Sequence, residues 1–179
     1  VAAKPIRVLV VDDQPVIRRG LSIMLAAEAD IDIVGQAADG EEAINFARAH
    51  QPDVVLMDLQ MPKLGGIAAT RTITALLPCT QVVVLTTFDT DELVFEAIRA
   101  GAQAYLLKDA LESEILDTIR GVHRGESRLA PHIARKVMDQ FRRMPDGASG
   151  ASDPLAAKVS HPGDDDAPLG VDTLTARED

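Results

Sequence analysis

The feature that most constrains the fold of this chain is a series of five short runs rich in Val, Ile and Leu. Their residues are nearly all apolar instead of alternating with polar ones, which is typical of parallel strands that helices cover on both faces. The segments between them carry apolar residues at helical spacing and have Gly or Pro near their ends. The runs comprise Ile6 to Val11, Ile31 to Gln36, Asp53 to Met57, Gln81 to Leu85 and Ala102 to Leu106.

This alternation predicts an α/β fold with a doubly wound, five-stranded parallel sheet. Right-handed crossovers leave few strand orders, and the flavodoxin-like order 2-1-3-4-5 suits five strands. Sheets of this kind bind ligands beyond the carboxyl ends of their strands, where the strand order reverses. In this order the reversal falls between strands one and three, so the residues after Val11 and Met57 are the first candidates for a site.

The bulk composition narrows the class of protein. With 179 residues, 46% of them hydrophobic, the chain can bury one core and leaves a remainder too small for a second full domain. The net charge of -10 and the lack of a long Lys/Arg run argue against nucleic-acid binding by this chain itself. A single cysteine, Cys79, and the absence of an apolar run near about 18 residues lead us to expect a cytoplasmic protein that makes no membrane contact.

The last third of the sequence has a different character. Ala130 to Met144 reads as an amphipathic helix with Ile133, Val137, Met138 and Phe141 on one side, and we predict a linker helix within 127–144. Residues 145–171 are rich in Gly, Ala, Ser, Pro and Asp, which predicts a flexible acidic linker. Residues 146–179 carry eight acidic and two basic side chains, a local charge of -6.

Polar side chains follow four of the five expected strands. Asp12 and Asp13 follow the first strand, Asp58 the third, Thr86 the fourth and Lys108 the fifth. Each alone has an ordinary explanation, because Asp caps helices and forms turns, Thr often ends strands and Lys is usually solvated. Together they favour one reaction at the carboxyl edge of the sheet.

Three crowded carboxylates repel one another, and a hard divalent cation relieves the repulsion. Oxygen ligands without paired His or Cys indicate Mg²⁺. Phosphoryl transfer needs an in-line nucleophile and positive charge on the transferred oxygens. Asp58 can attack to form an aspartyl phosphate, Mg²⁺ and Lys108 can neutralise the oxygens, and the Thr86 hydroxyl can donate to one of them. The product is a mixed anhydride that water destroys, which suits a temporary signal.

Three stretches of the sequence resemble the response-regulator receiver family, whose CheY-like fold is the one predicted above. The resemblance runs from about Ile6 to Arg124, is nearest to the NarL/FixJ branch, and gives a receiver domain over 4–126. It implies that a sensor histidine kinase phosphorylates Asp58. It also implies that Asp13 ligates Mg²⁺ directly, that Asp12 acts mostly through water, and that Asp58 and the backbone carbonyl of Gln60 complete the protein ligands. The stretches are Val8-Leu-Val-Val-Asp-Asp-Gln-Pro, Pro52-Asp-Val-Val-Leu-Met-Asp-Leu-Gln-Met-Pro and Tyr105-Leu-Leu-Lys-Asp.

The resemblance also implies a conformational switch. Thr86 and Tyr105 match the pair that shifts on phosphorylation, although Tyr105 read alone is also compatible with a half-buried aromatic residue of a strand. Such a protein is no enzyme beyond catalysing its own phosphorylation and dephosphorylation. We expect a homodimer that forms through the fourth helix, fifth strand and fifth helix, while helices one and five pair in parts of the family.

The C-terminal segment 172–179 resembles the opening of a LuxR-type helix-turn-helix domain through Leu174-Thr-Ala-Arg-Glu. The same residues also fit an ordinary capping box. We therefore expect a transcription regulator cut at the start of its DNA-binding module, which would contact DNA only through the missing helix-turn-helix domain.

Two other functions remain as alternatives. Hydrolases of the haloacid dehalogenase type also form an aspartyl phosphate with Mg²⁺ on a doubly wound sheet, but they place the nucleophile after the first strand in an Asp-x-Asp pattern. A receiver-like scaffold that binds partners without phosphorylation would not need the whole set of polar residues.

Overall fold

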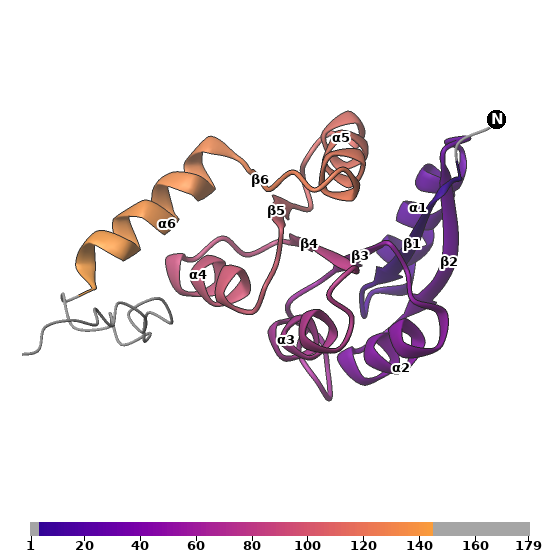
Figure 1. The fold of residues 1–179 in the computed structure, drawn as a ribbon, viewed down its shortest axis with the longest axis horizontal. Helices are drawn as coiled ribbons and strands as arrows, with labels where there is room; N and C mark the ends of the chain where they lie inside the picture. Colours follow the sequence, from indigo (N-terminus) through magenta and orange to yellow (C-terminus); the bar gives the residue numbers. More distant parts are fainter. Residues whose placement is uncertain (1–3, 145–179) are drawn as a thin grey trace, which may run out of the picture. The chain divides into compact units, whose positions relative to one another are not determined.

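The computed structural model of the chain describes residues 4–144, and within them six parallel strands form one sheet (Figure 1). The strand order is β2-β1-β3-β4-β5-β6, so the predicted order of the first five strands is confirmed. Every neighbouring pair is parallel, as the nearly all-apolar runs indicated. The strands are β1 (Ile6–Val11), β2 (Ile31–Ala37), β3 (Val54–Met57), β4 (Gln81–Thr86), β5 (Ala104–Leu107) and β6 (Arg128–Leu129).

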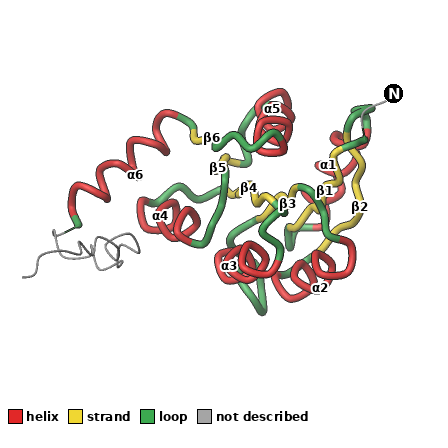
Figure 2. Tube along the Cα trace, viewed as in Figure 1, coloured by secondary structure: helices red, strands yellow, loops and turns green. Residues whose placement is uncertain are grey.

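Helices cover the sheet on both sides (Figure 2). Helices α1 and α5 lie on one face, whereas α2, α3 and α4 lie on the other (Figure 1). The helix α2 begins after Asp39, whose carboxylate accepts a hydrogen bond from the backbone of Glu42 at 2.9 Å, a standard N-cap. The helices are α1 (Pro15–Ala26), α2 (Gly40–His50), α3 (Gly66–Leu76), α4 (Asp91–Arg99), α5 (Glu112–His123) and α6 (Pro131–Arg143).

The central strands supply both halves of the core. In β1, Val8 and Val10 pack with the apolar residues of α1 and α5, whereas Leu9 and Val11 pack with those of α2 and α3. All four are at most 2% exposed. Because successive side chains of a strand point to opposite faces, a strand buried on both faces must be apolar throughout.

The strand predictions need correction. β2 ends at Ala37, β3 begins at Val54 and β5 ends at Leu107, each one residue from the predicted bound. The sheet has a sixth strand, β6, which pairs with β5 through Ala104 and Tyr105. Strand β5 begins at Ala104 instead of Ala102, because Gly101 turns the chain with a φ of 105° and the backbone N–H of Ala102 bonds back to Ala97. Strand β4 includes Thr86, which we had expected to follow it.

The amphipathic helix predicted within 127–144 is α6, but only part of its apolar stripe is buried. Ile133 and Val137 are 1% and 8% exposed, whereas Met138 and Phe141 are more than half exposed. The buried pair belongs to the same apolar cluster as residues of β4, α4 and β5, so α6 packs directly on the core beside the sheet. The predicted acidic linker over 145–171 and helix-turn-helix opening over 172–179 lie outside the described residues. No helix within residues 4–144 is long and apolar enough to span a bilayer.

Candidate functional site

The carboxyl ends of β1 and β3 lie side by side and each is followed at once by an aspartate. Val11 of β1 pairs with Met57 of β3, and the backbone N–H of Asp58 donates to the carbonyl of Val11 at 3.0 Å. This register places Asp12 and Asp58 next to each other at the edge where the strand order reverses. The sequence predicted this edge as the site, for the same reason.

Three carboxylates converge there. Ligand oxygens of Asp12, Asp13 and Asp58 all lie within 4.8 Å of one another. Asp12 and Asp58 are 1% and 4% exposed, while Asp13 is half-buried. An all-oxygen set of this size is the donor chemistry that hard cations such as Mg²⁺ take, so the residues present fit the predicted ion.

Local hydrogen bonds hold Asp12 in place. One oxygen of its carboxylate accepts from the backbone N–H of Gln14 at 2.9 Å, and Arg18 of α1 donates to its backbone carbonyl at 2.6 Å. Arg18 was not identified from the sequence as a site residue. Its position one helical turn after the start of α1 is the only signal that could have suggested it.

Lys108, the first residue after β5, reaches across the edge and bridges two of the carboxylates. Its ammonium lies 2.6 Å from Asp12 Oδ2 and 3.1 Å from Asp58 Oδ2. Burial lowers the pKa of Lys108, but the hydrogen bonds to Asp12 and Asp58 outweigh burial and leave the pKa above its ordinary value. Lys108 therefore stays a cation against the phosphoacceptor candidate.

The charge balance at Asp58 is different. Burial raises the pKa of the Asp58 carboxyl above its ordinary value, and although the hydrogen bond and charge of Lys108 oppose this rise, burial and the Asp12 carboxylate prevail. Added positive charge at the site would therefore favour the ionised, nucleophilic form.

Thr86 and Tyr105 both bond to the backbone of Phe88. The Thr86 hydroxyl oxygen accepts a hydrogen bond from the backbone N–H of Phe88 at 3.5 Å, at the outer limit for such a bond. The Tyr105 hydroxyl donates to the Phe88 carbonyl at 2.5 Å, and both Thr86 and Tyr105 are 0% exposed. The structure thus corrects the half-buried reading of Tyr105, whose side chain is fully buried. Phe88 was not identified from the sequence.

The loop after β3 carries the remaining predicted residue. Gln60 is exposed and lies between Asp58 and α3. The loop turns into α3 at Gly66, where a Cβ atom would stand 2.0 Å from the backbone carbonyl oxygen of Asp58 and 2.8 Å from Leu59 Cα. Only glycine fits against the backbone of the phosphoacceptor candidate.

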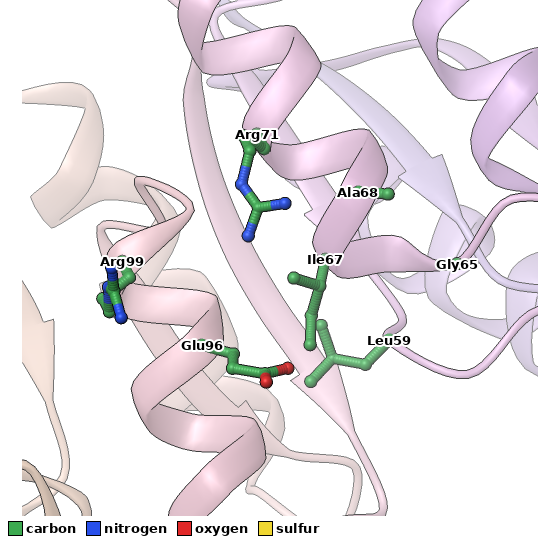
Figure 3. A pocket seen from close by; sticks show the side chains of 7 residues that line it. All are labelled: Leu59, Gly65, Ile67, Ala68, Arg71, Glu96 and Arg99. Carbon is green, nitrogen blue, oxygen red and sulfur yellow. The ribbon is translucent and has the colours of Figure 1, made fainter.

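A groove of about 590 Å³ lies between α3 and α4 (Figure 3). Arg71 of α3 and Glu96 of α4 extend into it, and Leu59 forms part of its floor (Figure 3). The three clustered aspartates and Lys108 are not among its lining residues. This groove is therefore distinct from the carboxylate cluster at the edge of the sheet.

Comparisons with known proteins agree with this geometry. The response regulator receiver domain family matches residues 8–120. The transcriptional regulatory protein YxjL of Bacillus subtilis (strain 168), described as uncharacterized, is 47% identical over 138 residues, which cover 77% of this chain and 63% of that protein. The chain thus spans less than two thirds of this relative.

Solved structures show the same fold. A two-component response regulator of the LuxR family from Aurantimonas sp. SI85-9A1 superposes with a TM-score of 0.71 at 29% identity, covering 78% of this chain and 99% of that one. CheY of Borrelia burgdorferi, solved with CheX, BeF₃ and Mg²⁺, has a TM-score of 0.63 at 28% identity, with 66% and 90% covered. The family match favours a receiver over the hydrolase that the sequence had left as an alternative.

Proposed function

The chain belongs to the response regulator receiver domain family of two-component signalling, and on that premise we propose that Asp58 is its phosphoacceptor and that Asp12, Asp13 and Asp58 hold Mg²⁺. One observation carries the assignment. Lys108 bridges Asp12 and Asp58 at the edge where the strand order reverses, so a fixed cation, a nucleophile and two further carboxylates share one small site. This is the set of groups that phosphoryl transfer to an aspartate requires.

Each residue has a separate task. An oxygen of Asp58 attacks phosphorus in line, and the bond from phosphorus to the donor's leaving group breaks as the aspartyl phosphate forms. The Lys108 ammonium is shared between Asp12 and Asp58 before the reaction. It then pairs with the negative charge on a phosphoryl oxygen. The Thr86 hydroxyl donates a hydrogen bond to another oxygen, and the Gln60 carbonyl would add a further oxygen ligand for the ion. Bound Mg²⁺ would supply positive charge to the same oxygens.

The signal ends by hydrolysis of the mixed anhydride. Water attacks phosphorus, phosphate leaves and the Asp58 carboxylate returns. The receiver thus catalyses only its own phosphorylation and dephosphorylation, consistent with the signalling role of its family.

Intact-mass measurement tests the assignment. The full chain is incubated with acetyl phosphate and Mg²⁺, and we expect the gain of one phosphoryl group. The gain should disappear in Asp58→Asn and persist in the control Asp32→Asn, which removes an exposed carboxylate of β2. Phosphorylation that survives in Asp58→Asn would overturn the site, and a chain that is never modified would favour the phosphorylation-independent scaffold.

The same assay tests the metal site. In Asp13→Asn we expect half-maximal phosphorylation to require more Mg²⁺, because one ligand oxygen loses its charge, while the fold survives since crowding among the carboxylates falls. An unchanged Mg²⁺ requirement would remove Asp13 from the ligand set.

The wider role follows from the family. Response regulators receive their phosphoryl group from sensor histidine kinases and often dimerise, and YxjL is named as a transcriptional regulatory protein. We extend these properties to the longer protein, in which a cytoplasmic receiver that switches through Thr86 and Tyr105 controls a DNA-binding domain.

A further inference from the structure

Helix α6 occupies the surface formed by α4 and β5. Its residues Ile133 and Val137 are buried in a cluster that includes Val84 of β4, Val94 of α4 and Tyr105 of β5. Farther along the helix, the rings of Phe141 and Phe95 meet edge to face with centroids 5.7 Å apart. Figure 1 shows α6 beside α4, beyond the edge of the sheet that β6 forms.

A polar contact ties the same helix to the segment that follows the phosphoryl site. The Lys136 ammonium donates to the backbone carbonyl of Asp89 and lies 3.2 Å from Asp89 Oδ2 and 3.5 Å from Asp91 Oδ1. Asp89 belongs to the connection between β4 and α4, which begins directly after Thr86, and Asp91 is the first residue of α4. Lys136 therefore connects α6 to the backbone next to the proposed site.

The segment Phe88–Asp91 is thus held from three directions. Its Phe88 N–H points to the Thr86 hydroxyl, its Phe88 carbonyl accepts from Tyr105, and Asp89 and Asp91 are held by Lys136. When the Thr86 hydroxyl turns toward a phosphoryl group on Asp58, its oxygen withdraws from the Phe88 N–H. The segment then moves toward the site or loses that bond, and in either case the contacts with Lys136 must adjust.

We propose that α6 is a latch that Lys136 fastens to the segment Phe88–Asp91, so that a phosphoryl group on Asp58 and docking of α6 oppose each other. The inference rests on the proposed function. Coupling between two events is reciprocal: if the phosphoryl group loosens α6, then loosening α6 must strengthen binding at Asp58 by the same factor. Because α6 is the element that leads toward residues 145–179, the latch links the site to the part of the protein that follows the receiver.

Beryllofluoride, a mimic of the phosphoryl group, allows both directions of the coupling to be measured on the full chain. Binding in the presence of Mg²⁺ is followed through the fluorescence of Tyr105, the single tyrosine of a chain without tryptophan. Lys136→Gln should bind beryllofluoride roughly two- to fivefold more tightly than wild type, the effect of losing the partly exposed ion pairs with Asp89 and Asp91. Lys136→Arg, which keeps the charge, should restore the wild-type affinity.

A control on the same helix separates the latch from a general effect of charge. Arg142 pairs with Asp139 within α6 at 3.2 Å, so Arg142→Gln removes the same charge without touching the segment after β4. It should leave the beryllofluoride affinity unchanged. An equal gain in Arg142→Gln and Lys136→Gln would overturn the role of Lys136.

Hydrogen exchange of the α6 amides measures the other direction. Saturation with beryllofluoride and Mg²⁺ should speed exchange across 131–143 in wild type, and Lys136→Gln should show faster exchange already without the mimic. Adduct formation with unchanged or slower α6 exchange would overturn the latch and leave the proposed function intact. A wild-type chain that forms no adduct and is not modified at Asp58 would overturn both.

Discussion

Substitution of Ile133 tests whether α6 is part of the receiver core or a separate linker helix. The side chain is 1% exposed and packs among residues of β4, α4 and β5. Truncation to alanine removes buried methyl and methylene groups and leaves a cavity, which costs about 2–5 kcal/mol in well-packed cores. We expect Ile133→Ala to lower the free energy of unfolding by about 3 kcal/mol. For a domain of this size each kcal/mol lowers Tm by about 3 °C, so the melting temperature should fall by about 9 °C.

Met138→Ala is the matched control. Met138 lies on the same helix and in the same predicted apolar stripe but is 56% exposed, so its truncation should change stability by less than about 0.5 kcal/mol. Both variants are compared by thermal and urea unfolding followed by circular dichroism. If Ile133→Ala is as stable as Met138→Ala, α6 does not contribute to the core and the separate linker helix predicted from the sequence is correct. A smaller first transition that appears only in Ile133→Ala would show that α6 undocks before the sheet unfolds. The stability lost in unfolding of the sheet would then be smaller than the total loss.

Two further outcomes follow from single residues near the site. Gly66→Ala would place a Cβ atom 2.0 Å from the Asp58 carbonyl oxygen, so urea unfolding should show a loss of more than about 2 kcal/mol, whereas Gly65→Ala, whose Cβ would lie 3.5 Å from the nearest atom, should lose far less. Equal losses would contradict the close packing. Burial raises the pKa of Tyr105, so absorbance at 295 nm should show no phenolate in the folded chain at pH values just above 10, where an unfolded tyrosine ionises. Because the folded pKa is the higher one, the stability that Tyr105 contributes is fully present below about pH 10 and is lost as pH rises toward the folded pKa; a phenolate signal before unfolding would refute this.

The sequence predicted the elements whose residue pattern leaves few structural solutions. Strands buried on both faces must be apolar throughout, and parallel strands bring their carboxyl ends to one edge. Together with the common doubly wound order for five strands, this predicted the neighbourhood of Asp12, Asp58 and Lys108. Strand β6 was missed because it has only two residues, Arg128 and Leu129, which is too short to show a hydrophobic pattern. The start of β5 was misplaced because Ala102 is apolar, whereas the turn at Gly101 decides where pairing begins.

The limits at α6 have a different cause. Helical periodicity identifies an apolar stripe but not how much of it meets another surface, so Ile133 and Val137 were grouped with Met138 and Phe141, although only the first two are buried. The bond from Lys136 to Asp89 joins residues 47 apart in sequence. Such a contact depends on where α6 docks, and a single sequence carries no signal for that placement.

The position of α6 also determines which surfaces of this domain are accessible for pairing with a second copy. The sequence favoured pairing along α4, β5 and α5, but α6 buries Ile133 and Val137 on the α4 and β5 part of that surface. A second copy can reach the α4 and β5 surface only after α6 undocks. Undocking exposes the apolar side chains of that surface and of α6 itself. Pairing there therefore carries the cost of undocking α6, whereas pairing through α1 does not, because α1 carries exposed apolar residues, Val16 at 82% and Ile23 at 64%, that are already accessible. If a phosphoryl group loosens α6 as proposed, it lowers the free-energy cost of undocking α6. Dimerisation through α4 and β5 is then coupled to Asp58 through this helix and not through a direct change of the dimer surface.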